Sequence, residues 1–130
     1  MWNRRLFVIL VLLAGCTRST NQLKDALPVE VQRAWTLKQT TNLDPGQAPE
    51  VVRSLGLKRS LEARYEGNGS ILVRVYEMNV ETSAFELIQK WRQSDGLAVY
   101  KGAYFLVATS AGPDSATTGA FLNALKETIK

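Results

Sequence analysis

The sequence predicts an α+β domain in which helices pack on one face of an antiparallel sheet. Two glycine-containing hairpin patterns predict the sheet, one between residues 57 and 78 and the other between 97 and 110. Segments with helical spacing of apolar residues follow each hairpin. With a first strand at Arg33–Thr40 and a short helix after Pro49, the predicted order is β-α-β-β-α-β-β-α. We therefore expect two hairpins plus an N-terminal strand.

The first hairpin turns at the sequence EGNGS, which allows two registers. In the first register, a two-residue type I′ loop joins the strands. In the second, the loop has three residues, Gly67–Gly69, with Gly69 in a left-handed conformation. Only the second register separates the two kinds of side chain, because it pairs Tyr65 with Ile71 on one face and Glu62 with Arg74 on the other. Since a slip of one residue exchanges the faces of a strand, we predict the three-residue loop.

The second hairpin, LAVYKGAYFLVATS, is apolar on both faces, which is typical of strands that are covered on both sides. Before it, SAFE matches a capping box of Ser83 and Glu86 and predicts the start of a helix. The last helix is predicted to begin near Asp114. The apolar stripes of these two helices are Ala84, Phe85, Ile88 and Trp91 in the first, and Phe121, Leu122, Leu125 and Ile129 in the last.

The N-terminal residues predict an export signal. Arg4 and Arg5 precede an apolar run at 6–13, which is shorter than the roughly 20 residues that a membrane-spanning helix needs. The run ends in Leu13, Ala14, Gly15 and Cys16, and this LAGC sequence resembles the lipobox of bacterial lipoproteins. The sequence NRRLFV also fits a twin-arginine signal. The export route therefore stays open, although the short n-region favours general export.

The lipobox resemblance implies that a signal peptidase recognises Leu13, Ala14 and Gly15 and cuts before Cys16. The cysteine then carries a diacylglyceryl group and an N-acyl chain, and we expect no other cofactor. Two or three acyl chains make a stable membrane anchor. Thr17, rather than Asp, follows the cysteine, which in this family favours the outer membrane, facing the periplasm, if the organism has one. The predicted organisation is a signal peptide at 1–15, a lipidated tether at 16–27 and a single domain at 28–130.

The composition argues against several kinds of chemistry. The chain has no histidine and one cysteine, which excludes Ser-His-Asp and Cys-His nucleophile systems and the usual zinc sites. Without Arg4 and Arg5, 14 basic residues stand against 12 acidic ones, and no basic run is interleaved with aromatics, so we expect no nucleic-acid partner. The acidic residues are interpreted as partners in ion pairs, Glu62 with Arg74 and Glu77 with Arg59. We therefore predict no catalytic residue and no metal site.

One surface of the first hairpin is a candidate interaction face, because aromatic and arginine side chains are typical of protein recognition. Its residues are Arg64, Leu72, Arg74 and Tyr76, beside Tyr100 and Phe105. In the alternative interpretation, the segment with Trp35 or another helix covers this face. The predicted function is that of a membrane-anchored, non-catalytic interaction or assembly module with an envelope protein as partner. The alternative is a small-ligand-binding protein, or a small lipoprotein enzyme, with a cleft between sheet and helices.

A second resemblance concerns the middle of the chain. The stretch ARYEGNGSILVRVYEMNVETSAFELIQKWR, followed by KGAYFLV, is similar to an uncharacterised domain family of exported bacterial proteins. The similarity covers about residues 45–110 and involves residues that form the fold. It implies no catalytic residues.

Overall fold

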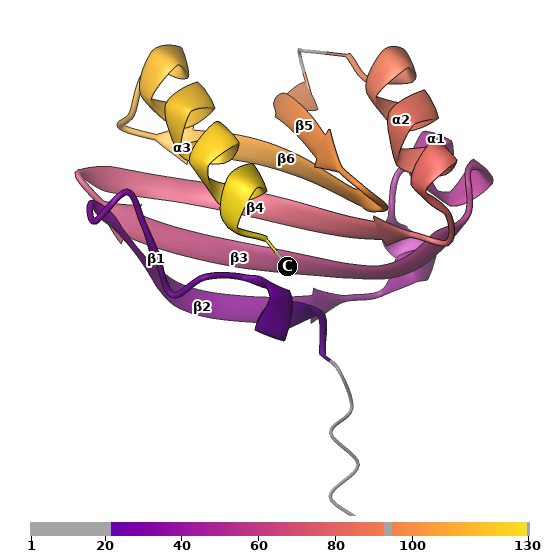
Figure 1. Cartoon of the computed structure of the whole chain (residues 1–130), viewed down its shortest axis with the longest axis horizontal. Helices are drawn as coiled ribbons and strands as arrows, with labels where there is room; N and C mark the ends of the chain where they lie inside the picture. Colours follow the sequence, from indigo (N-terminus) through magenta and orange to yellow (C-terminus); the bar gives the residue numbers. More distant parts are fainter. Residues whose placement is uncertain (1–21, 93–94, 130) are drawn as a thin grey trace, which may run out of the picture.

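A computed structural model describes residues 22–92 and 95–129. Six strands form one antiparallel sheet in the order β1-β2-β3-β4-β6-β5, and the long strands curve across the molecule (Figure 1). The predicted α+β class and antiparallel sheet are confirmed, but the predicted order lacks one strand, the two-residue Glu30–Val31. The elements are η1 (Leu23–Ala26), β1 (Glu30–Val31), β2 (Trp35–Leu43), η2 (Pro45–Gln47), α1 (Glu50–Ser54), β3 (Leu57–Gly67), β4 (Gly69–Met78), α2 (Glu81–Lys90), β5 (Leu97–Lys101), β6 (Tyr104–Ala111) and α3 (Ser115–Thr128).

The β3–β4 hairpin has the predicted register, although the strands pair as far as Gly67 and Gly69 and leave only Asn68 between them. Tyr65 pairs with Ile71, and Glu62 pairs with Arg74. The loop needs glycine at position 69, where φ is +106° and an added Cβ would lie 2.8 Å from the carbonyl oxygen of Ala111. The hairpin therefore presents one apolar face and one mixed face, which decides where the helices can pack.

The apolar face forms the main core together with α3. Phe121 of α3 stacks edge-on against Tyr65, with ring centroids 5.1 Å apart, and against Trp35 at 5.8 Å. The Tyr65 hydroxyl donates a hydrogen bond of 2.7 Å to the carbonyl oxygen of Pro28, so its polar end is satisfied within the core. The four residues predicted for the buried stripe of the last helix are all buried here: Phe121, Leu122, Leu125 and Ile129.

The opposite face is covered by the other two helices, which corrects the expectation that all helices pack on one face. Val52 of α1 and Leu87 of α2 pack against Tyr76 and Phe105 in a second core. The physical reason is the second hairpin, whose two faces are both apolar and must both be covered. Accordingly, β5 lies between α2 and α3 in Figure 1, and it contacts both helices.

Two further expectations need correction. The predicted tether at 16–27 includes η1, where Leu23 and Leu27 are buried in the main core, so the folded part begins at least as early as Leu23. Helix α2 begins at Glu81 rather than after Ser83, which lies buried within the helix. The predicted signal peptide, its recognition residues and Cys16 lie outside the described residues.

Candidate functional site

A groove of about 650 Å³ lies on the face covered by α1 and α2, beyond the point where the second core ends. Its floor is the sheet itself. Leu72 and Thr109 are cross-strand partners on β4 and β6, and so are Arg74 and Val107. Tyr76 continues the same face of β4, because alternate residues of a strand point to one side. The groove therefore has a floor fixed by the ladder of the sheet.

The two walls come from segments far apart in the sequence. Pro49 and Val51 form one wall at the start of α1. The other wall follows the end of α2 and contains Trp91. Its indole NH donates a hydrogen bond of 3.3 Å to the carbonyl oxygen of Gly96, and its ring packs edge-on against Phe105 with centroids 5.2 Å apart. Trp91 is thus held in place as an apolar side of the groove.

Positive charges dominate the lining. Arg74 lies on the floor, Lys90 and Arg92 lie on the α2 wall, and Asp95 is the one carboxylate among the lining residues. Arg74 Nε is 3.4 Å from Glu62 Oε2, and about half of the arginine side chain is exposed. Such exposed pairs are worth about 0–1 kcal/mol, so Arg74 remains open to competing anions.

The floor is more buried toward α1. Tyr76 is only 2 % exposed. Burial raises the pKa of the Tyr76 hydroxyl, and the neighbouring Arg74 guanidinium opposes that rise. The phenol therefore stays neutral at physiological pH and serves as a polar, uncharged end of the groove.

A smaller cavity of about 150 Å³ adjoins the groove. The two share Pro49, Arg74 and Tyr76 in their linings, and the smaller one continues toward Asp44 and Glu62. The hollow surface is therefore longer than the groove alone, and its charge changes from cationic near α2 to acidic near η2.

The structure places the four residues of the predicted interaction face on one side of the sheet. Leu72, Arg74 and Tyr76 line the groove, whereas Arg64 lies beyond it and pairs with Glu66 at 3.5 Å. The aromatic half of the predicted face is covered. Of the two aromatics expected beside it, Phe105 is fully buried, and Tyr100 packs under Phe85 with ring centroids 5.9 Å apart.

The alternative interpretation of this face is right for one end of it. Another helix does cover one end of it, as the alternative stated, but the covering elements are α1 and α2. Trp35 lies on the opposite face against Phe121. Phe85, expected in the core, is 49 % exposed, and Leu87 is buried in its place.

Sequence reasoning missed the walls of the groove. Pro49, Lys90 and Arg92 are separated from β4 by many residues, and no motif connects them. The one signal that could have found them is the apolar second face of the second hairpin, which requires a covering helix there. Placing α2 on that face would have brought its cationic end beside Arg74.

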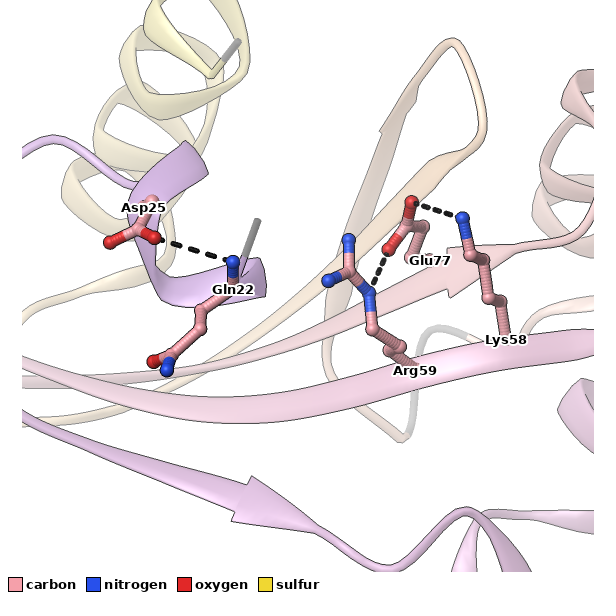
Figure 2. A network of polar contacts seen from close by, with 5 residues as sticks. All are labelled: Gln22, Asp25, Lys58, Arg59 and Glu77. Carbon is pink, nitrogen blue, oxygen red and sulfur yellow. Dashed lines mark hydrogen bonds and ion pairs between the residues drawn. The ribbon is translucent and has the colours of Figure 1, made fainter. Parts of the chain in front are cut away.

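Glu77 forms the predicted ion pair with Arg59. Glu77 accepts a hydrogen bond of 2.6 Å from Arg59 Nε, and Lys58 Nζ lies 3.6 Å away (Figure 2). The hydrogen bond to Glu77 raises the pKa of Arg59. Glu77 thus lies between two cations, and this cluster is an ion-pair network rather than a pair of carboxylates with divided acid and base roles.

Within the described ranges, no group of three or more acidic, histidine or cysteine side chains could hold a metal ion. The helices described there are also too short or too polar to cross a membrane. The glycine loop at 67–69 joins two strands and does not precede a helix, so it lacks the geometry of a phosphate-binding loop.

Comparisons with known proteins do not assign the chain to a family. No protein-family model, no curated protein and no solved structure matches the chain. The groove and the sequence are thus the whole basis for a functional proposal.

Proposed function

We propose that this protein is a lipid-anchored envelope lipoprotein whose domain binds a segment of another envelope protein in the groove and performs no catalysis itself. The lipobox-like LAGC sequence supports the anchor, with lipid on Cys16 after cleavage behind Leu13, Ala14 and Gly15. Thr17 after the cysteine favours the outer membrane, facing the periplasm, if the organism has one. A domain of this kind would work close to the membrane surface.

One observation carries the proposed binding role. The sheet face is sealed by helices at one end and left as a groove at the other, where Leu72, Arg74 and Trp91 come together. Mixed apolar and arginine surfaces around a fixed aromatic ring are typical of protein recognition sites. The continuation of the hollow past Tyr76 toward Asp44 suits an extended segment better than a compact ligand.

A small-ligand-binding protein is the second candidate. It is favoured by the volume of about 650 Å³, because small-molecule sites commonly enclose about 300–1,000 Å³. A small ligand would stay bound during gentle purification, or would bind with a stoichiometry of one. A protein segment would then compete with this ligand for the groove.

The anchor is tested by mass spectrometry of the mature N-terminus. We expect a lipidated cysteine at position 16 and loss of the lipid in Cys16→Ser. An unmodified Cys16 in the mature chain would refute the anchor, and it would leave the groove to be tested on its own.

The binding role is tested by capture of the tagged full chain after mild crosslinking in the producing cell. We expect one defined partner band with the unaltered chain, and its loss when Thr109→Trp fills the groove. Arg64→Gln is the matched control, because Arg64 lies on the same sheet face outside the groove. A band that persists in Thr109→Trp would contradict the proposal.

A further inference from the structure

The lining of the groove is unbalanced in charge. Three cationic side chains, Arg74, Lys90 and Arg92, face it with one carboxylate, Asp95. Lys90 is within 3.2 Å of Glu86 on the same helix, with both side chains about half exposed. Arg92 has no ion pair within the part of the chain that the structure describes. Two of the three cations are therefore held only in exposed ion pairs and Arg92, among the described residues, in none, so an incoming anion can compete for all three.

Arg74 is placed to receive a carboxylate. It lies on the floor between the apolar Leu72 and the buried Tyr76, and Val107 is its cross-strand partner. Its Nε contacts Glu62 at 3.4 Å, at the long end of a charge-assisted hydrogen bond. A guanidinium has five N–H donors in a planar fork, so it can hold an incoming carboxylate through two of them while Glu62 stays nearby.

The apolar part of the groove lies next to these cations. Trp91 is fixed by its hydrogen bond to Gly96 and by its edge contact with Phe105. Leu72 and Val107 line the floor beside it. A rigid aromatic ring beside a charged group is the arrangement in which a binding partner places an apolar anchor side chain.

The length and charge gradient of the hollow limit the shape of the occupant. From Leu72 to Tyr76 the floor runs about 13 Å along β4. The adjoining cavity then continues to Asp44 and Glu62. An extended peptide of about four to six residues spans this distance, and its acidic side chains would be repelled at the η2 end and attracted at the α2 end.

We propose that the groove binds an acidic, extended peptide segment of the partner, with a carboxylate on Arg74 and Arg92 and an apolar side chain against Trp91. This inference rests on the proposed function, because it names the chemistry of the segment that the groove binds. Complementary charge also predicts faster association at low salt and weaker binding as salt screens the groove.

The test uses the full chain, purified in a neutral detergent, on two peptide arrays. One array holds acetylated hexapeptides in which Glu and Asp occupy every arrangement with Leu, Phe and Ser. The other replaces each Glu by Gln and each Asp by Asn. We expect the best acidic peptides to bind at least tenfold more tightly than their amide twins, and to lose at least fivefold in affinity between 50 mM and 500 mM NaCl.

Variants then locate the binding. Arg74→Gln and Arg92→Gln should each weaken the best acidic peptide at least fivefold. Arg64→Gln, the control on the same face, should stay within twofold. Equal binding of acidic and amide arrays, or equal losses in Arg64→Gln and Arg74→Gln, would overturn the inference.

The remaining outcomes separate this inference from the proposed function. If amide peptides bind as well as acidic ones and Thr109→Trp blocks both, the groove binds peptides and the acidic preference is wrong. If sodium phosphate or 4-phenylbutyrate displaces the best peptide at equal concentration, the occupant is a small anion and the peptide inference is overturned. If neither array binds and Thr109→Trp leaves the crosslinked partner unchanged, both proposals fail.

Discussion

The two faces of the sheet differ in how completely helices cover them. One 14-residue helix, α3, together with η1, closes the apolar face, where Tyr65, Ile71 and Val73 are fully buried. The other face has two helices, but α1 has five residues and α2 has ten. They bury Tyr76 and Phe105 at one end and leave a groove beyond them. The number of helices on a face therefore says less about its exposure than their length and position do.

The largest loss of stability is expected from a cavity in the core between α3 and the apolar face of the sheet, which we call the closed face. Phe121→Ala removes a fully buried ring that packs against Tyr65 and Trp35, and such substitutions cost about 3–5 kcal/mol. Leu72→Ala on the open face should cost less than about 1 kcal/mol, because its side chain is already partly exposed. Urea unfolding of both variants measures the difference, and equal losses would contradict the contrast between the faces.

A backbone substitution at the hairpin loop tests the register that separates the two faces. Gly69→Ala places a Cβ where φ is +106° and where the Ala111 carbonyl oxygen is 2.8 Å away. We expect a loss of about 1–3 kcal/mol, since strain of this size is typical of such positions. The change in the free energy of unfolding checks it. An unchanged stability would show that the loop adopts another turn.

Alkaline pH should weaken the closed face. Burial raises the pKa of Tyr65 well above its ordinary value near 10. A raised pKa in the folded state means that the stabilising contribution is complete below about pH 10 and is lost as the pH rises toward the folded pKa, because the unfolded chain ionises first. The free energy of unfolding should fall above pH 10 by up to about 1.4 kcal/mol per pH unit for this group.

Tyr65→Phe provides the matched variant for that pH dependence. It keeps the ring in the core and removes the ionisable hydroxyl with its 2.7 Å hydrogen bond to Pro28. We expect a cost of about 1 kcal/mol at pH 7 and a flatter decline above pH 10. If the decline is as steep in this variant as in the unaltered chain, Tyr65 is not the group responsible.

The smallest effect is expected inside α3 itself. Gly119 lies within the helix, and an added Cβ would meet nothing within 4 Å. Gly119→Ala should therefore stabilise the protein by about 0.5–1 kcal/mol, because alanine is the better helix former. A rise in the thermal midpoint would confirm that residue 119 is helical and has free space around it. A fall would indicate that an added Cβ meets another side chain there.

The sequence predicted the hairpin register and the buried stripe of α3 because both depend on local alternation of apolar residues. Tyr65 opposite Ile71, and Phe121 with Leu125, follow from spacing alone. The groove could be predicted only in its floor. Leu72, Arg74 and Tyr76 share one strand, and their common face is a consequence of the two-residue period.

The walls of the groove depend on tertiary packing, which sequence spacing does not encode. The capping box at Ser83 suggested a later start for α2, whereas the helix begins at Glu81 without a side-chain cap. Phe85 and Leu87 then exchange their expected positions, since Leu87 is buried and Phe85 is half exposed. An error of this size in one helix is enough to hide which side chains border the groove.

Site-specific photocrosslinking tests most directly whether the partner binds at the sheet face that carries the groove. A photoreactive amino acid is placed at Thr109 in the groove, or at Ala116 on the exposed side of α3, in the full chain within the producing cell. We predict one defined crosslinked partner from position 109, absent in the Arg74→Gln background, and none from position 116. The same product from both positions, or a product from position 116 alone, would contradict the account.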